Sequence, residues 1–202
     1  MALWLADRPL VLASKSASRR SLLQAAGIPI EVLVADIDER GIEAKAGLAD
    51  PGAVAVLLAR EKALAVSVQE PGCMVLGADQ TLALGQRRFS KPADRAAARD
   101  QLKVLRGHTH ALHSAVAILH DGKPVFEHCA VARLAMRAFS DEFLESYLDA
   151  AGDAVTASVG AYQVEGFGVQ LFERIDGDHS TILGLPLLPV LDALRRQGVL
   201  RA

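Results

Sequence analysis

The order of apolar stretches is the feature that most constrains the fold of this 202-residue chain. Short apolar runs at 9–13 and 74–78, each followed by polar residues, are typical of buried strands. The longer alanine-rich stretch at 51–68 predicts a helix instead. Two more apolar runs flank the turn residues Asp121, Gly122 and Lys123, which predicts a hairpin. Strands that alternate with helices and include a hairpin favour an α/β fold with a mixed sheet.

The remaining predicted elements complete this pattern. We expect further strands at 30–34, 111–120 and 125–137, and further helices at 19–26, 93–105, 140–150 and 186–197. Segment 85–92 mixes glycine, proline and cations as a functional loop does, and 157–185 is glycine-rich with strand-like pieces. Because no repeat or low-complexity linker interrupts the chain, we expect one domain over residues 1–202, either compact or divided into two lobes.

Composition and charge narrow the class of substrate. With 51% hydrophobic and 23% charged residues, the chain can bury a core, unlike a disordered protein. A net charge of -2 gives no overall attraction to nucleic acid polymers or anionic membranes, so a small anion bound by local cations is expected. The N-terminus lacks a basic leader region and no apolar stretch reaches about 20 residues, which predicts a cytoplasmic protein. The spacing of Cys73 and Cys129 matches no metal or redox motif, so both are expected to be buried apolar residues.

The segment at 14–20, Ser-Lys-Ser-Ala-Ser-Arg-Arg, lies between a predicted strand and a predicted helix. It can offer backbone N–H groups, hydroxyls and two guanidinium groups to one anion. The alternative is a capped helix with solvated arginines. However, arginines in a first helical turn oppose the helix dipole, which costs a few tenths to about 1 kcal/mol unless an anion compensates. The placement therefore favours a polyphosphate ligand.

Carboxylates form a second group of candidate residues. Asp79 directly follows the buried run MVLGA and should emerge at the end of a central strand, where open α/β sheets bind ligands. A structural cap is the alternative. Asp36, Asp38 and Glu39 add oxygen ligands of the kind that suit Mg²⁺ or Mn²⁺ on a triphosphate, although such a patch also fits a solvated turn.

The other polar residues are less specific. Lys62 and Lys91 are further cations, and each alone also fits a surface lysine. His108, His110 and His113 lack the HxxxH spacing of a zinc hydrolase, so we expect histidines in a turn or at the edge of the core. No GxxxxGKS loop, catalytic serine motif or dinucleotide fingerprint is present.

Taken together, these segments resemble the Maf family of nucleoside triphosphate pyrophosphatases over nearly the whole chain. The motifs that carry the resemblance are LASKSASRRSLL at 12–23, DIDE at 36–39, EKA at 61–63, GADQT at 77–81, SKP at 90–92, GAYQVEGFG at 160–168 and GLPL at 184–187.

The resemblance implies a fold, a reaction and a set of roles. The fold would be an elongated mixed sheet flanked by helices with a deep central cleft, as in Maf and inosine-triphosphatase-like proteins. The reaction would be house-cleaning hydrolysis of a nucleoside triphosphate to the monophosphate and pyrophosphate, with Mg²⁺ or Mn²⁺. The family often forms homodimers. Asp79 would accept a proton from water, Glu39 and Asp79 would lie near the metal, and the phosphates would be held by Ser14, Arg19, Arg20, Lys62 and Lys91.

Three positions bear on the base of the substrate. Gln80 after Asp79 and Glu165 before Gly166 look like the family members that act on 7-methyl-GTP, but Ser18 stands where those proteins carry a tryptophan. A carboxylate such as Glu165 can accept from the adjacent N1–H and N2 amino groups of guanine, whereas glutamine suits uracil or thymine. Ser18 has no ring to stack on a cationic nucleobase, an interaction worth roughly 0.5 to 2 kcal/mol or more.

We therefore expect a pyrophosphatase for a modified or guanine nucleotide, with 7-methyl-GTP favoured. A dTTP/UTP-type pyrophosphatase, a nucleotide-binding regulator of cell division or septum formation, and a simple phosphate-ester hydrolase are the alternatives. The combination of Asp79, Glu39 and Lys91 disfavours a regulator that only binds a nucleotide, since such a protein needs no general base to activate water. Gln80 and Glu165 disfavour the ester hydrolase, since both residues are better explained by recognition of the nucleobase of a nucleotide.

Overall fold

The structure is a computed structural model that describes residues 2–202. The chain divides into two compact units. The first comprises Met1–Gln80, Ser114–Ala130 and Asp178–Ala202, and the second comprises Thr81–His113 and Val131–Gly177.

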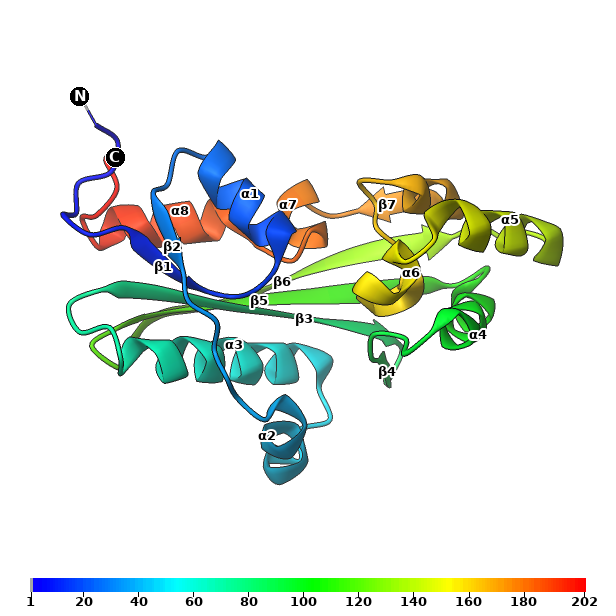
Figure 1. Ribbon diagram of the computed structural model, residues 1–202, viewed down its shortest axis with the longest axis horizontal. Helices are drawn as coiled ribbons and strands as arrows, with labels where there is room; N and C mark the ends of the chain where they lie inside the picture. The colour runs from blue at the N-terminus through cyan, green and yellow to red at the C-terminus, as the bar shows by residue number, and fades with distance from the viewer. Residues whose placement is uncertain (1) are drawn as a thin grey trace. The chain divides into compact units, whose positions relative to one another are not determined.

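A seven-stranded sheet organises the chain (Figure 1). Its main path runs in the order β2-β1-β3-β5-β6-β7, and β4 pairs with β3 off this path. Parallel pairs (β1 with β2 and β3) and antiparallel pairs (β3 with β4, β6 with β7) coexist, which confirms the predicted α/β class and mixed sheet. The predicted cleft and single domain stay predictions. The strands are β1 (Leu10–Ala13), β2 (Ile30–Val32), β3 (Met74–Leu84), β4 (Arg87–Phe89), β5 (Thr109–His120), β6 (Lys123–Met136) and β7 (Phe172–Asp176).

In the first unit, helices cover both faces of the strands (Figure 1). Leu10, Leu12 and Leu76 pack in one cluster with side chains from α1 and α8. The alternate residues Val11 and Val75 face the other way, into a cluster with α3. This alternation follows from the two-residue period of a strand, and it explains why the strands read as continuous apolar runs. The helices of this unit are α1 (Ala17–Ala25), α2 (Glu39–Ala46), α3 (Pro51–Ser67), α7 (His179–Ile182) and α8 (Leu187–Arg196).

Gly77 sets how closely α3 approaches β3. A Cβ atom at this position would lie 2.0 Å from the carbonyl oxygen of Ala59 and 2.8 Å from the backbone nitrogen of Ala63. Backbone atoms cannot move aside as a flexible side chain can, so only glycine permits this contact. The helix therefore crosses the strand two residues before Asp79, within reach of Lys62.

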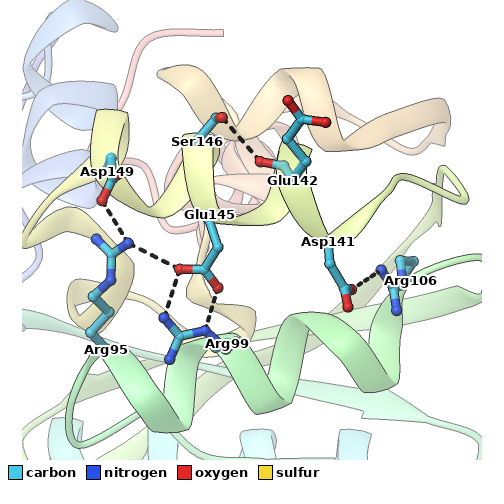
Figure 2. Close-up of polar contacts among 8 residues, drawn as sticks. All are labelled: Arg95, Arg99, Arg106, Asp141, Glu142, Glu145, Ser146 and Asp149. Atoms are coloured by element: carbon cyan, nitrogen blue, oxygen red, sulfur yellow. Dashed lines mark hydrogen bonds and ion pairs between the residues drawn. The ribbon is translucent and has the colours of Figure 1, made fainter.

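The second unit contains the remaining elements, α4 (Arg95–Leu105), α5 (Asp141–Ala151), α6 (Ala154–Ala157), η1 (Val159–Ala161) and η2 (Phe167–Leu171), with β4 and β7. Figure 2 shows that ion pairs join α4 to α5. Arg99 binds both carboxylate oxygens of Glu145, at 2.5 and 2.7 Å, and Arg95 lies 2.6 Å from Asp149. The guanidinium of Arg99 is the main reason that the pKa of Glu145 is lowered to about 2.

Several predicted boundaries were wrong. The strand expected at 74–78 continues through Asp79 to Leu84, because its last residues pair with β4, inside the segment expected to be a loop. Helix α2 was not predicted, because its residues show no apolar face and none of them is buried. Segment 157–185, expected to contain strand-like pieces, has one strand, β7, together with short helices. Within residues 2–202, no helix is both long and apolar enough to cross a membrane.

Candidate active site

Three predicted site residues meet in the first unit. Asp79 lies on β3 and is only 8% exposed, and its Oδ1 accepts a hydrogen bond of 2.6 Å from Nζ of Lys62 on α3. The same ammonium lies 2.9 Å from Oε1 of Glu39, the first residue of α2. Segments that are distant in the sequence thus place two carboxylates around one cation. This cluster carries a net negative charge, which favours a further cation.

The two carboxylates of this cluster fit a divalent cation that is bound together with the phosphates of a substrate. Among residues 2–202, no group of three or more His, Cys, Asp or Glu side chains comes together as a ready metal site. Mg²⁺ is commonly held by one or two carboxylates, with phosphate oxygens and water as the other ligands. Glu39 and Asp79 supply those two carboxylates. Asp38 instead caps α2, accepting from the backbone N–H of Gly41 at 3.0 Å, and Asp36 is exposed.

The predicted phosphate-binding segment forms a tight turn between β1 and α1. The hydroxyl oxygen of Ser14 accepts from the backbone N–H of Ser16 at 3.3 Å and from Nη1 of Arg19 at 3.1 Å. Ser16 is the N-cap of α1 and accepts from the backbone N–H of Arg19 at 3.3 Å. Because a hydroxyl has two acceptor lone pairs and one donor, Ser14 retains its O–H for an anion.

The two arginines of this segment differ. Arg20 is exposed on the first turn of α1, as a phosphate ligand requires, and Ser18 beside it is half-buried. Arg19 instead points into the first unit. Its Nε donates to the carbonyl of Gly184 at 2.8 Å and its Nη1 donates to the carbonyl of Ala78 at 2.8 Å. Burial lowers the pKa of Arg19 from its usual value, and the charges of Asp79 and Glu39 partly offset that effect.

Gln80 has its amide nitrogen engaged by the protein. Nε2 lies 2.7 Å from Oγ of Ser114 and 3.2 and 3.1 Å from the carbonyls of Thr181 and Ile182 on α7. An amide nitrogen has two donors, so these acceptors use both. Gln80 therefore offers a ligand only its carbonyl oxygen.

Two predicted residues belong to the second unit. Lys91 is exposed, and the carbonyl of the preceding Ser90 accepts from Gln101 of α4 at 2.7 Å, which holds the segment. Glu165 is exposed on a turn that precedes η2. The backbone N–H of Gly166 closes this turn on the carbonyl of Gln163 at 3.2 Å. The structure therefore presents both side chains to solvent, while the cluster around Asp79 lies in the first unit.

The sequence reasoning did not identify Gly184, Ser114 and Thr181 as neighbours of the site. Gly184 belongs to the GLPL motif, which was a signal without an assigned role. Ser114 and Thr181 gave no signal, because ordinary polar residues in a strand and a short helix have many uses. The predicted turn position of His110 was wrong, since this histidine lies on β5 and is 1% exposed.

Comparison with known proteins gives full-length similarities. The model of the Maf-like protein family matches residues 9–197. A nucleoside triphosphate pyrophosphatase of Rhodopseudomonas palustris (strain BisB18) is 58% identical over 200 residues, which is 99% of both chains. A protein of the same name from Bradyrhizobium diazoefficiens is 59% identical with the same coverage. A 7-methyl-GTP pyrophosphatase of Brucella abortus biovar 1 is 52% identical over 191 residues, or 93% of this chain and 96% of that protein.

Proposed function

This chain belongs to the Maf-like protein family and is a nucleoside triphosphate pyrophosphatase, and we propose that it cleaves the α–β phosphate bond of a guanine nucleotide, with 7-methyl-GTP as the leading substrate. The products are the nucleoside monophosphate and pyrophosphate. The observation that carries the proposal is the cluster formed by the buried Asp79, the partly buried Lys62 and the exposed Glu39.

In the proposed reaction, Asp79 is the general base. Lys62 holds Oδ1 of the carboxylate at 2.6 Å, which leaves Oδ2 to accept a proton from the attacking water. The water oxygen bonds to the α-phosphorus, and the bond from that phosphorus to the bridging oxygen breaks. Pyrophosphate leaves with the electron pair of that bond. The ion pair fixes the orientation of the base, which is what a positioned proton acceptor needs.

The remaining charges stabilise the phosphates. Ser14 would donate its hydroxyl hydrogen to a phosphoryl oxygen. The exposed cations Arg20 and Lys91 would bind further phosphoryl oxygens. Glu39 and Asp79 would hold Mg²⁺ or Mn²⁺, which supplies Lewis-acid stabilisation of charge on those oxygens. Lys62 would contribute its own charge to stabilise the departing pyrophosphate.

Residues Glu165 and Gln80 support the base preference. The exposed carboxylate of Glu165 suits the adjacent donors of guanine, and the carbonyl of Gln80 is a further acceptor. The name of the Brucella abortus relative is in line with a methylated guanine base. Ser18 supplies no ring for stacking, so we expect the preference for 7-methyl-GTP over GTP to be modest. A homodimer stays a prediction from the family resemblance.

The direct test is a turnover screen of purified protein over GTP, 7-methyl-GTP, dTTP and UTP with Mg²⁺ or Mn²⁺. We expect pyrophosphate as the product and 7-methyl-GTP at the head of the ranking. Release of orthophosphate alone would disprove cleavage of the α–β bond, and a pyrimidine at the head of the ranking would disprove the base assignment.

Replacement of the proposed base is the matched mutational test. Asp79→Asn keeps the size of the side chain and removes its basicity, so turnover should fall by roughly 10² to 10⁴. Asp7→Asn, at an exposed carboxylate of the first unit outside the motifs named above, serves as the control. Unchanged turnover in Asp79→Asn would remove Asp79 from the role of base.

A further inference from the structure

We infer that Arg19 is a positioning residue that ties together three parts of the active site, rather than the phosphate ligand that its motif predicts. The inference rests on the proposed function, because it concerns the same reaction. It follows from the acceptors that Nε and Nη1 of the guanidinium already bind within the protein. Arg20, its neighbour in the sequence, is then the phosphate-binding arginine of the pair.

Each contact of Arg19 leads to a different functional segment. The carbonyl of Ala78, bound by Nη1 at 2.8 Å, belongs to the residue directly before Asp79. The hydroxyl of Ser14, bound by Nη1 at 3.1 Å, begins the phosphate-binding turn. The carbonyl of Gly184, bound by Nε at 2.8 Å, follows α7, whose own carbonyls accept from Gln80. The planar guanidinium of Arg19 thus fixes Asp79, the phosphate-binding turn and the segment that binds Gln80 relative to one another.

Gly184 is shaped to receive this side chain. Its φ of +89° lies in the left-handed region that favours glycine, and an added Cβ atom would lie 3.3 Å from both Nε and Nη2 of Arg19. A larger residue would therefore strain the backbone and require the guanidinium to shift by a few tenths of an ångström. Gly184 of the GLPL motif and Arg19 of the N-terminal motif, 165 residues apart in the sequence, thus contact each other directly.

Arg19 also sets the direction of the Ser14 hydroxyl. Nη1 of Arg19 and the backbone N–H of Ser16 both donate to its oxygen, so the hydroxyl hydrogen must point away from both donors. If Arg19 were drawn to a phosphate instead, Ser14 would lose that constraint. In this arrangement Ser14 contacts the phosphate, and Arg19 orients the hydroxyl group of Ser14.

The test compares Arg19→Ala, Arg19→Lys and Gly184→Ala with Arg20→Ala, with steady-state turnover and with pyrophosphate as a competitive inhibitor. For Arg19→Ala we expect kcat to fall by about 10- to 100-fold while the inhibition constant of pyrophosphate changes by less than about 3-fold. Arg20→Ala should instead weaken pyrophosphate by about 10-fold or more, and this loss should shrink in high salt.

Two further variants separate positioning from charge. Arg19→Lys keeps the charge but cannot span the three acceptors, so its kcat should fall nearly as far as in Arg19→Ala. Gly184→Ala changes no charge and should reproduce the loss of kcat. Combined with Arg19→Ala it should add little, because both changes break the same contact.

The inference is overturned if Arg19→Ala weakens pyrophosphate as much as Arg20→Ala does, or if Arg19→Lys restores full turnover. In those cases a wild-type protein that still releases pyrophosphate leaves the proposed function intact. If the wild type releases no pyrophosphate from any triphosphate, the proposed function fails and the role of Arg19 in catalysis fails with it.

Discussion

At the scale of single residues, hydrogen-bond partners decide which atoms of a predicted site residue remain for a ligand. Gln80 has committed its amide nitrogen to Ser114 and the carbonyls of α7, so only its oxygen can contact a base. Glu165 is exposed and acceptor-only when ionised. The two oxygens of its carboxylate would suit the adjacent donors of guanine and not the mixed edge of uracil or thymine. We therefore expect the choice of nucleobase to depend on Glu165 more than on any other predicted residue.

The corresponding prediction is that Glu165→Gln shifts the substrate ranking toward UTP and dTTP, because the new amide adds a donor. A lost or mismatched hydrogen bond to a base is worth about 1 to 3 kcal/mol, so the ratio of kcat/KM values should change by roughly 5- to 150-fold. Glu173→Gln, at an exposed carboxylate of the same unit, is the control. An unaltered ranking would count against Glu165 as the residue that recognises the base.

At the scale of elements, the site depends on the close packing of α3 against β3. Gly77 lets the helix backbone approach the strand, and this approach brings Lys62 to Asp79. The contact between α4 and α5 is of another kind, since it consists of partly exposed ion pairs (Figure 2). Such pairs contribute little to stability and are weakened by salt. The close backbone packing at Gly77 is therefore the more critical of the two contacts.

We predict that Gly77→Ala lowers both stability and turnover. Its Cβ atom would overlap the carbonyl of Ala59, and overpacking of this kind costs typically about 1 to 3 kcal/mol of unfolding free energy. A displaced α3 would also separate Lys62 from Asp79, so kcat should fall. Urea unfolding and steady-state kinetics measure the two effects. In the control Gly166→Ala, a Cβ atom meets only the carbonyl of Gln163 at 3.8 Å, so its unfolding free energy should be unchanged. Equal stability of wild type and Gly77→Ala would contradict this account of the contact.

At the scale of the whole molecule, a buried histidine links stability to pH. His110 is 1% exposed in the second unit, and its Nε2 lies 2.7 Å from the hydroxyl oxygen of Tyr162. Among residues 2–202, no hydrogen-bond partner is found for its Nδ1. The rings of Tyr162 and Phe172 surround it at 5.6 and 5.8 Å between centroids. This burial lowers the pKa of His110 from 6.5 to about 4.

The unfolded chain therefore binds a proton to this histidine at a higher pH than the folded protein does. The contribution is fully present above pH 6.5 and is lost as the pH falls toward about 4, on the order of 3 kcal/mol in total. We predict that His110→Gln, which can still bond to Tyr162 but does not titrate, flattens the pH dependence of the unfolding free energy between pH 4 and 6.5. His108→Gln, at an exposed histidine, should keep the wild-type slope. Identical slopes in wild type and His110→Gln would contradict the assignment.

The sequence by itself determined the fold class, most elements and the candidate residues. Runs such as 9–13 and 74–78 are apolar because both faces of their strands are covered, so the pattern is readable without coordinates. Helix α5 was predicted from its cap at Ser140, which is a local interaction. The family motifs named Asp79, Lys62 and Glu39, although nothing in the sequence required that they meet.

Only the tertiary structure decided which residues contact one another. The ion pair of Lys62 with Asp79 depends on how closely α3 packs on β3, and the contact of Arg19 with Gly184 joins opposite ends of the chain. Local patterns do not identify such pairs, because the same side chain can face solvent, a phosphate or a backbone carbonyl. Packing and hydrogen bonding in the folded protein determine which of these partners a side chain contacts. For Arg19 they are the backbone carbonyls of Ala78 and Gly184.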